Sequence, residues 1–382
     1  MTTNRTHPIH LFVVLTTGMS LKAWQDIGML SREMALYSRL KPNLAGVTIV
    51  SHGTHKDLDV INQFPGIGLI VNRFGIPNWV YRRLLPGLAR QRCRGSLAIF
   101  KSNQIKGADE AQRLAQIDNG VFIARCGYLL SDFEARAHGG SSPQFRAAEA
   151  LERNAFGAAA QSIVSTGAMR DTVLSYGVAS DKINVVPNYV DTDLFAPPAR
   201  RPSQRRVIFI GRLSPQKNPL LLIEALAGLD AELDVIGKGP LQAQMDALAR
   251  EKNIAVRFHG AVPNHKIPDY INNADVFVLP SNYEGHPKTL LEAMSCGVSV
   301  VGGNSPGINN VIDHNRTGLL ADTNSHSLRA AIKQLLDDPD CARRLGDAAR
   351  REIESTVSLD RVVEMELAVY EKAALTPQTV ST

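Results

Sequence analysis

Two glutamates, Glu284 and Glu292, lie eight residues apart in the segment SNYEGHPKTLLEAMSCG, residues 281–297. Glu292 lies within an apolar run, Leu290–Met294, that a protein core would bury. An unpartnered buried carboxylate is costly, so we expect a hydrogen-bonding partner at Glu292. Carboxylates accept hydrogen bonds from vicinal hydroxyls, which a ribose or a hexose presents. A structural Arg or Lys would satisfy Glu292 in another way.

Two cations, Arg212 and Lys217, follow the apolar run Val207–Ile210, and Gly211 marks the end of that run. Two cations next to a helix N-terminus form a binding site for a diphosphate. Taken alone, they also fit a solvated basic loop.

A third strand end, LDVIGKGP at residues 233–240, resembles the start of a dinucleotide-binding GxGxxG motif. Gln242 replaces the third glycine, so an ordinary strand-to-helix turn is the better interpretation and a dehydrogenase is excluded.

Short apolar runs that alternate with helical patterns must position these residues. Runs that are apolar on both faces and separated by helices predict parallel sheets covered on both sides. The expected strands are Ile9–Leu15, Val47–Ser51, Gly68–Val71, Leu97–Phe100, Val121–Arg125, Ser162–Ser165, Asn184–Val186, Val207–Ile210, Leu233–Ile236, Val256–His259, Val276–Leu279 and Val298–Val301.

Twelve strands are too many for one ordinary sheet, and the segment Ala196–Arg206 (APPARRPSQRR) divides them as a linker would. We therefore expect two Rossmann-like, doubly wound domains, residues 1–195 and 196–358, with a helix at 359–375 that crosses back to the first. Ligands of such sheets bind outside the carboxyl ends of the strands, so two facing domains would share a cleft.

The bulk composition limits the classes of protein. At 382 residues, 44% hydrophobic and 21% charged, the chain can bury full cores. Its four cysteines show no CxxC spacing, which argues against a disulfide framework or zinc site and suits a reducing compartment. We find no signal peptide and no apolar run of about 20 residues that could span a membrane. We therefore expect a cytoplasmic location.

Positive charge is concentrated in the window Val60–Ala108, which contains no Asp or Glu. Its cations are Arg73, Arg82, Arg83, Arg90, Arg92, Arg94, Lys101 and Lys106. Nucleic acid, anionic lipid and a phosphorylated substrate are all candidate partners. Nucleic acid is disfavoured because neither an aromatic-rich sheet surface nor a recognition helix accompanies the window.

Within this window, residues 78–90 suit a helix lying on an anionic leaflet of the membrane. The residues expected to share an apolar face are Trp79, Leu84, Leu85 and Leu88, flanked by Arg82, Arg83 and Arg90. Pro86-Gly87 could break this helix in two. An ordinary core-facing helix with a basic solvated side fits the same pattern.

The second half of the chain resembles a known family. EGHPKTLLEAMSCG resembles the E-x7-E signature of retaining glycosyltransferases of the GT-B fold, in the large family four. IGRLSPQKNP resembles the G-R-x(4)-K diphosphate segment of that family. FHGAVPNHKIPDYINNADVFVLPS resembles its base-binding loop and next strand, and VVPNYVDTDLF resembles its hinge. The first half matches only in outline.

The resemblance implies a site for a nucleotide-diphosphate sugar. Arg212 and Lys217 would neutralise the diphosphate, and Glu284, the third catalytic residue, would hold hydroxyls of the donor sugar. Glu292 would hold the ribose hydroxyls, which accounts for a glutamate in an apolar run. The donor-binding positions are Gly18, Gly211, Val262, Gly285, His286, Pro287 and Glu292.

The acceptor side departs from the family pattern. The region 123–128 lacks the His that many relatives carry there, and the acidic position often found near Pro306-Gly307-Ile308 is Asn. The polar strand ends expected to face an acceptor are Lys101, Asn103, Arg125 and Tyr128.

The resemblance implies no cofactor besides the nucleotide sugar and no essential metal. Asp191-Thr192-Asp193 is a DxD, the metal motif of the other major glycosyltransferase fold. It falls in the hinge match, away from the phosphate segment, so we interpret it as structural, with Arg212 and Lys217 in the place of a metal.

These patterns together predict a retaining hexosyltransferase that moves a sugar from a nucleotide-diphosphate donor to a saccharide or lipid-linked acceptor. Assembly of surface polysaccharide or glycoconjugate at the inner face of the cytoplasmic membrane is the expected setting, with peripheral contact to anionic lipid. Two alternatives stay open, a nucleotide-sugar epimerase of the same fold and a non-catalytic sugar-nucleotide-binding partner protein.

Overall fold

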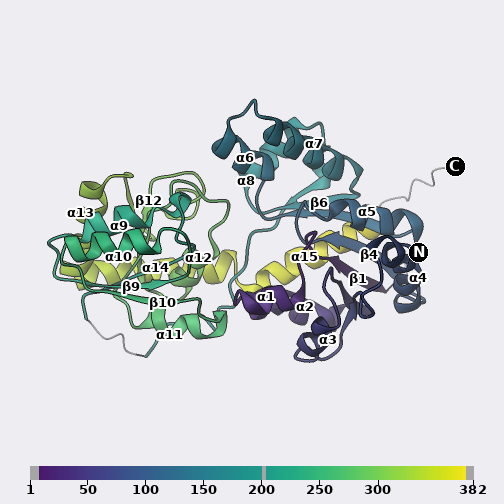
Figure 1. Cartoon of the computed structure of the whole chain (residues 1–382), viewed down its shortest axis with the longest axis horizontal. Helices are drawn as coiled ribbons and strands as arrows, with labels where there is room; N and C mark the ends of the chain where they lie inside the picture. The colour runs from purple at the N-terminus through teal and green to yellow at the C-terminus, as the bar shows by residue number, and fades with distance from the viewer. Residues whose placement is uncertain (1–7, 200–203, 376–382) are drawn as a thin grey trace, which may run out of the picture. The chain divides into compact units, whose positions relative to one another are not determined.

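The computed structural model describes residues 8–199 and 204–375 (Figure 1). Part of the predicted linker, residues 200–203, lies outside the described residues. The chain divides into two compact units. The first contains the residues up to Pro187 together with the segment from Val362, and the second is Asn188–Arg361. The boundary after Pro187 precedes the predicted one after Phe195.

The first unit is built on a seven-stranded parallel sheet in the order β3-β2-β1-β4-β5-β6-β7. Its strands are β1 (Ile9–Val14), β2 (Gly46–Val50), β3 (Ile67–Ile70), β4 (Leu97–Ser102), β5 (Val121–Cys126), β6 (Gln161–Val164) and β7 (Ile183–Val185). Its helices are α1 (Leu21–Asp26), α2 (Leu30–Leu40), η1 (Lys41–Asn43), α3 (Lys56–Ile61), α4 (Asn78–Arg92), α5 (Ala108–Ile117), α6 (Leu130–His138), α7 (Pro143–Ala158), α8 (Gly167–Ser175) and η2 (Ser180–Lys182).

The second unit is built on a six-stranded parallel sheet in the order β10-β9-β8-β11-β12-β13. Its strands are β8 (Arg206–Ile210), β9 (Glu232–Ile236), β10 (Val256–Gly260), β11 (Val276–Leu279), β12 (Ser299–Gly303) and β13 (Leu319–Ala321). Its helices are η3 (Pro215–Lys217), α9 (Pro219–Leu226), α10 (Gln242–Glu251), η4 (Asn264–Lys266), α11 (Ile267–Asn272), α12 (Lys288–Ser295), α13 (Ser325–Asp337) and α14 (Pro339–Thr356).

The prediction of two doubly wound parallel sheets is confirmed. In Figure 1, α10 and α11 lie on opposite sides of β9 and β10, so this sheet is covered on both faces. This covering explains why the central strands β11 and β12 are apolar on both faces, since every one of their residues is buried. The sequence analysis did not predict β13.

Each strand order reverses direction at one point, between β1 and β4 in the first unit and between β8 and β11 in the second. Loops that follow the strands on either side of such a point diverge and leave space for a ligand. The segments that carry Arg212, Lys217 and Glu284 follow β8 and β11. The topology therefore brings these residues to the switch point of the second unit.

The terminal helix α15 (Leu359–Ala374) starts in the second unit and packs in the first. The ammonium of Lys101, on β4, lies 2.6 Å from both carboxylate oxygens of Glu366 and 3.2 Å from the Tyr370 hydroxyl. Lys101 is only 1% exposed. This buried ion pair ties α15 to the sheet and occupies the cation that the sequence analysis assigned to an acceptor.

Candidate functional site

The loop after β8 carries the two candidate phosphate-binding cations. Arg212 is exposed directly after the strand, and Lys217 closes the short helix η3. Asn218 then adopts a left-handed conformation (φ 49°), which turns the chain into α9. An exposed guanidinium and an ammonium thus lie next to the start of a helix, an arrangement that attracts anions.

The two glycines of the β9 turn hold this loop in place. A Cβ atom on Gly237 would lie 1.9 Å from the Gly211 carbonyl oxygen, and one on Gly239 would lie 2.3 Å from the Leu213 carbonyl oxygen. The Leu213 N–H donates to the Lys238 carbonyl at 3.0 Å. The glycines of LDVIGKGP therefore allow two backbones to approach closely. From the sequence, these glycines predicted only a strand-to-helix turn.

The loop after β11 meets the β8 loop through an ion pair. The Lys217 ammonium lies 2.6 Å from Oε1 of Glu284, whose side chain is buried. Backbone contacts hold the two loops together, because Asn282 N–H donates to the Gln216 carbonyl and the Gln216 amide donates to the Tyr283 carbonyl. The structure thus brings together Lys217 and Glu284, 67 residues apart in the chain.

A third loop, after β12, contacts the backbone of Glu284. The Glu284 N–H donates to the Pro306 carbonyl at 2.8 Å. A Cβ atom on Gly307 would lie 2.2 Å from the Glu284 carbonyl oxygen, and Gly307 has a φ of +85°. Only glycine fits this position, so Gly307 sets the backbone of the Glu284 loop. This role of Gly307 was not predicted from the sequence, in which the Pro306-Gly307 segment is notable for lacking an acidic residue.

Glu292 lies on α12 and is 2% exposed. The Asn264 side-chain amide donates to its Oε1 at 2.9 Å. Asn264 is buried in η4, and the partly buried Val262 precedes it in the same turn after β10. The expected partner of Glu292 thus includes an uncharged amide from the predicted base-binding loop. This contact joins the proposed ribose and base positions.

His286 is held by hydrogen bonds to Asn188, the first residue of the second unit. Its Nδ1 accepts a hydrogen bond from the Asn188 N–H at 3.1 Å, and the Asn188 side-chain amide donates to the His286 carbonyl at 2.8 Å. Burial, and secondarily the charge of Lys288, lowers the His286 pKa from 6.5 to about 4. The ring is therefore neutral at pH 7, and with Nδ1 accepting, its proton is on Nε2. Gly285 and Pro287 flank this anchored residue.

The remaining predicted residues lie in the first unit. Gly18, in the turn after β1, has a φ of +82°, and a Cβ atom there would meet nothing within 4 Å. At the carboxyl ends of β4 and β5, the Arg125 guanidinium donates to the Asn103 carbonyl at 3.0 Å. Tyr128 is exposed beyond this contact.

Tyr128 also lines a hollow of about 190 Å³, together with Gln104, Ile105, Lys106 and Leu130. Gln104 belongs to the predicted polar strand end 101–104, whereas Lys106 was not among the predicted acceptor residues. Lys101, which was, is buried against Glu366 because α15 returns over the end of β4.

The DxD segment forms a local turn. Oδ1 of Asp191 accepts hydrogen bonds from the N–H groups of Asp193 and Leu194 at 3.2 Å. Within residues 8–199 and 204–375, no cluster of three His, Cys, Asp or Glu side chains is arranged to hold a metal ion.

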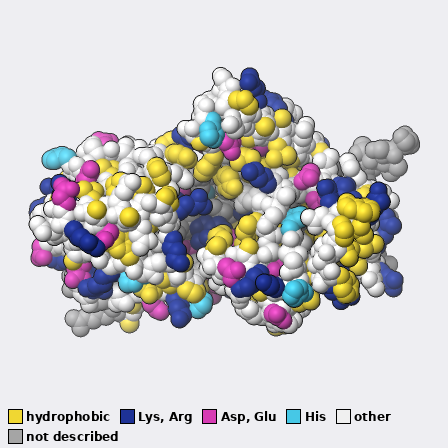
Figure 2. All heavy atoms as spheres, in the orientation of Figure 1, with side chains coloured by type: hydrophobic (Ala, Val, Ile, Leu, Met, Phe, Trp, Pro, Cys, Tyr) yellow, Lys and Arg dark blue, Asp and Glu magenta, His cyan; other side chains and the backbone are white. Residues whose placement is uncertain are grey.

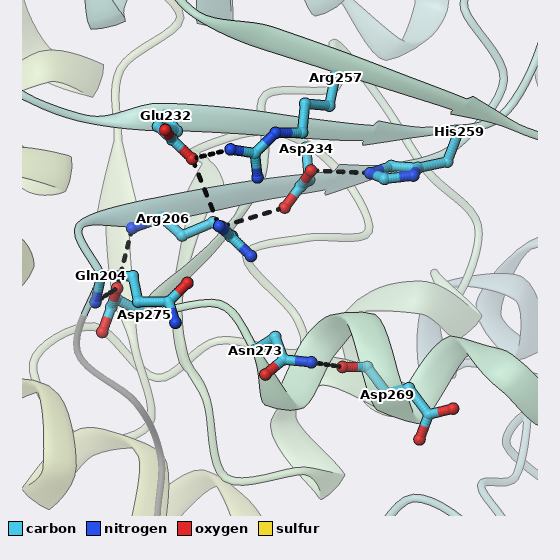
Figure 3. A network of polar contacts seen from close by, with 9 residues as sticks. All are labelled: Gln204, Arg206, Glu232, Asp234, Arg257, His259, Asp269, Asn273 and Asp275. Carbon is cyan, nitrogen blue, oxygen red and sulfur yellow. Dashed lines mark hydrogen bonds and ion pairs between the residues drawn. The ribbon is translucent and has the colours of Figure 1, made fainter.

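A polar network on β8, β9 and β10 was not anticipated from the sequence (Figure 3). Asp234 accepts from His259 at 2.7 Å and lies 3.4 Å from Arg206, and Glu232 pairs with Arg206 and Arg257. The network starts at the first residues of β8 and β9, at the opposite end of the strands from Lys217. We therefore assign it to holding the edge of the sheet together.

Comparison with known proteins gives a consistent picture. The family model described as "Glycosyl transferases group 1" matches residues 190–352. The chain is 31% identical over 255 residues to the alpha-maltose-1-phosphate synthase of Mycolicibacterium smegmatis, covering 59% of this chain and 66% of that protein. It is 33% identical over 201 residues to a GDP-mannose-dependent alpha-(1-6)-phosphatidylinositol monomannoside mannosyltransferase of Mycobacterium tuberculosis, covering 46% of this chain and 52% of that protein.

Among solved structures, the HepE protein of Anabaena in complex with UDP superposes with a TM-score of 0.76 at 14% identity, covering 94% of this chain and 99% of that one. The apo lipopolysaccharide outer core galactosyltransferase WaaB superposes with a TM-score of 0.66 at 16% identity, covering 95% and 99% of the two chains. These likenesses extend the shared fold across both units, including the first.

Proposed function

Because residues 190–352 belong to the glycosyl transferases group 1 family, we propose that this chain transfers a hexose from a nucleotide-diphosphate donor to an acceptor hydroxyl with retention of anomeric configuration. The observation that carries the proposal is the Lys217–Glu284 pair at the β8/β11 switch point, beside the exposed Arg212. This places two cations and a carboxylate at the sheet edge where a diphosphate and a sugar would meet.

In the proposed reaction, the bond between the anomeric carbon and the diphosphate oxygen breaks, and the acceptor oxygen bonds to the same face of that carbon. The acceptor proton passes to the departing diphosphate, so no protein base is required. Arg212 and Lys217 stabilise the charge that develops on the diphosphate, which is the main contribution that the protein makes to the rate. Once the diphosphate engages Lys217, Glu284 is available to accept hydrogen bonds from sugar hydroxyls.

The donor site extends from these residues toward the nucleoside. Glu292 holds the ribose hydroxyls, with Asn264 fixing its orientation, and the turn around Val262 contacts the base. We assign Gly211 and Gly285 to the donor loops, where the lack of a side chain would let backbone groups approach the donor. A Cβ atom on Gly18, in the turn after β1 of the first unit, would meet nothing within 4 Å. No metal ion is needed, because side chains and helix N-termini meet the phosphate charge.

The first donors to test follow from the relatives. HepE was crystallised with UDP-glucose, and the mycobacterial mannosyltransferase is named as GDP-mannose-dependent. The proposed acceptor is a saccharide or a lipid-linked saccharide, contacted by Asn103, Arg125 and Tyr128 of the first unit. The proposed setting is surface polysaccharide or glycoconjugate assembly at the inner face of the cytoplasmic membrane. The lipid-linked acceptor in this proposal is supported by the curated relative that is named for a phosphatidylinositol monomannoside.

The test is single-turnover transfer with a panel of nucleotide sugars. We expect Lys217→Ala and Arg212→Ala each to lower the rate about 10²- to 10³-fold, the usual effect of removing one stabilising donor. Lys252→Ala and Arg250→Ala, exposed cations on the same unit, are matched controls. Unchanged rates in the first pair would reject the assignment. An epimerised donor formed without acceptor, or donor binding without turnover, would favour the two alternative functions.

A further inference from the structure

One face of the first unit exposes large apolar side chains next to arginines. Phe74, before α4, is 76% exposed, and Trp79, in the first turn of α4, is 63% exposed. Leu84 and Leu88 of the same helix are exposed as well. Figure 2 shows a patch of apolar side chains bordered by Lys and Arg at the position that α4 occupies in Figure 1. A contiguous exposed apolar patch on a protein surface usually marks a binding site.

The structure changes which residues form this face. α4 runs unbroken from Asn78 to Arg92 with Pro86 inside it. Leu85, predicted to share the apolar face, is instead buried with Tyr81 and Ala89 on the core side. The sequence-based interpretation as a core-facing helix therefore accounts for one side of α4 and leaves Trp79, Leu84 and Leu88 unexplained.

The charges on this face also differ from the expectation. Arg82 and Arg90 are paired at 2.7 Å with Glu110 and Asp118, carboxylates of the α5 region that follow the acid-free window. Arg73 and Arg83 have no carboxylate partner in the described part of the chain. The guanidinium of Arg73 lies 4.5 Å from the centre of the Phe74 ring, and that of Arg83 lies 5.2 Å from the centre of the Trp79 ring.

We propose that the α4 face, defined as Phe74, Trp79, Leu84 and Leu88 with Arg73 and Arg83, docks this chain on an anionic lipid bilayer. The inference rests on the proposed function in one respect, since a lipid-linked acceptor would lie in that bilayer. The aromatic rings enter the boundary between headgroups and acyl chains, and the arginines beside them stay level with the lipid phosphates.

Charge decides between this occupant and a second copy of the chain. A self-association through the α4 face would bring Arg73 and Arg83 of two copies together without added carboxylates. An anionic leaflet instead supplies the opposite charge over the whole face, so attraction adds to apolar burial. Residues 60–108 contain no Asp or Glu, so this segment carries no negative side chain that the anionic leaflet would repel.

The chain carries its own reporter for the test. It has two tryptophans, and Trp24 is buried while Trp79 is exposed. The full chain is titrated with vesicles of phosphatidylcholine alone and of phosphatidylcholine mixed with phosphatidylglycerol, and tryptophan emission and co-sedimentation are recorded. We expect a blue shift and pelleting only with the mixed vesicles, both weakened by salt. Trp79→Phe should abolish the shift.

Charge variants test the recognition itself. Arg73→Ser/Arg83→Ser should lower the partition coefficient about thirtyfold, since each basic residue near the surface contributes about fivefold. Phe74→Ser/Trp79→Ser should also lose binding. Arg250→Ser/Arg343→Ser removes the same charge from exposed positions of the second unit and serves as the control. An equal loss in both arginine pairs, equal binding to the two vesicle types, or a dimer that Phe74→Ser/Trp79→Ser dissolves would overturn the proposal.

The failure of this inference is separable from failure of the proposed transfer. Donor binding is measured in the same α4-face variants and should match wild type, because none of these residues belongs to the donor site. Conversely, Lys217→Ala should bind mixed vesicles as wild type does, whatever its effect on transfer.

Discussion

The contact between His286 and Asn188 makes the second unit sensitive to acid. Nδ1 of His286 accepts a hydrogen bond from the Asn188 N–H. Protonation of the imidazole would therefore place two donors opposite each other in a buried site. The folded-state pKa of about 4 lies below the ordinary value of 6.5. Between these values the unfolded chain binds the proton more readily than the folded one. The stability is therefore complete above pH 6.5 and is lost progressively as the pH falls toward 4.

The magnitude follows from the shift. The full pKa shift of His286 corresponds to about 3 kcal/mol of folding free energy, since one unit of pKa is worth about 1.4 kcal/mol. At pH 5 the penalty has reached about 2 kcal/mol, which would lower the melting temperature of a unit of this size by about 4–8 °C. The same strain favours local release of the His286–Asn188 contact before the whole unit unfolds.

The assay compares thermal unfolding at pH 7 and pH 5 in wild type, His286→Asn and His326→Asn. Asparagine places its side-chain oxygen near the position of Nδ1 and cannot be protonated, so His286→Asn should remove about 2 kcal/mol of the acid sensitivity. His326, an exposed histidine of α13, is the matched control and should change nothing. Equal acid sensitivity in all three proteins, or an imidazole pKa for His286 measured by NMR at 6.5 or above, would refute the reasoning.

Four further predictions concern the ion pair, the loops and the metal. Lys101→Met should lower the free energy of unfolding, measured by chemical denaturation, by about 3–5 kcal/mol because it leaves the buried Glu366 carboxylate without its partner. Lys101→Met/Glu366→Leu should recover most of that loss. A double variant no more stable than the single one would contradict the pairing. Gly307→Ala should raise the KM for donor by displacing the Glu284 loop, whereas Gly75→Ala, also at positive φ but with open space around it, should not. Glu292→Gln should weaken nucleotide binding in calorimetry about tenfold or more with a smaller effect on kcat, and unchanged affinity would remove it from the ribose site. EDTA should leave transfer intact, and an activity that manganese restores would assign Asp191 and Asp193 to a metal site.

The sequence by itself determined the fold class and the positions of most strands. A parallel strand covered on both faces must be apolar at nearly every residue, and this local property is legible in runs such as Val276–Leu279. The sequence also predicted a candidate site, because ligand-binding loops follow strands and carry residues that a core would not tolerate. Glu292, a carboxylate in an apolar run, was informative for this reason.

Only the tertiary structure decided which partners these residues meet. Lys101 looks like a polar strand end until α15 returns with Glu366, 265 residues later. Arg82 and Arg90 look like free cations until Glu110 of α5 and Asp118, the residue after α5, supply carboxylates. Nothing in the sequence around His286 indicates its contact with Asn188. Periodicity and turn chemistry are properties of neighbouring residues, whereas a buried charge or imidazole takes its role from whichever distant segment packing brings within hydrogen-bonding distance. The desolvation that makes such contacts strong does not exist until the chain has folded.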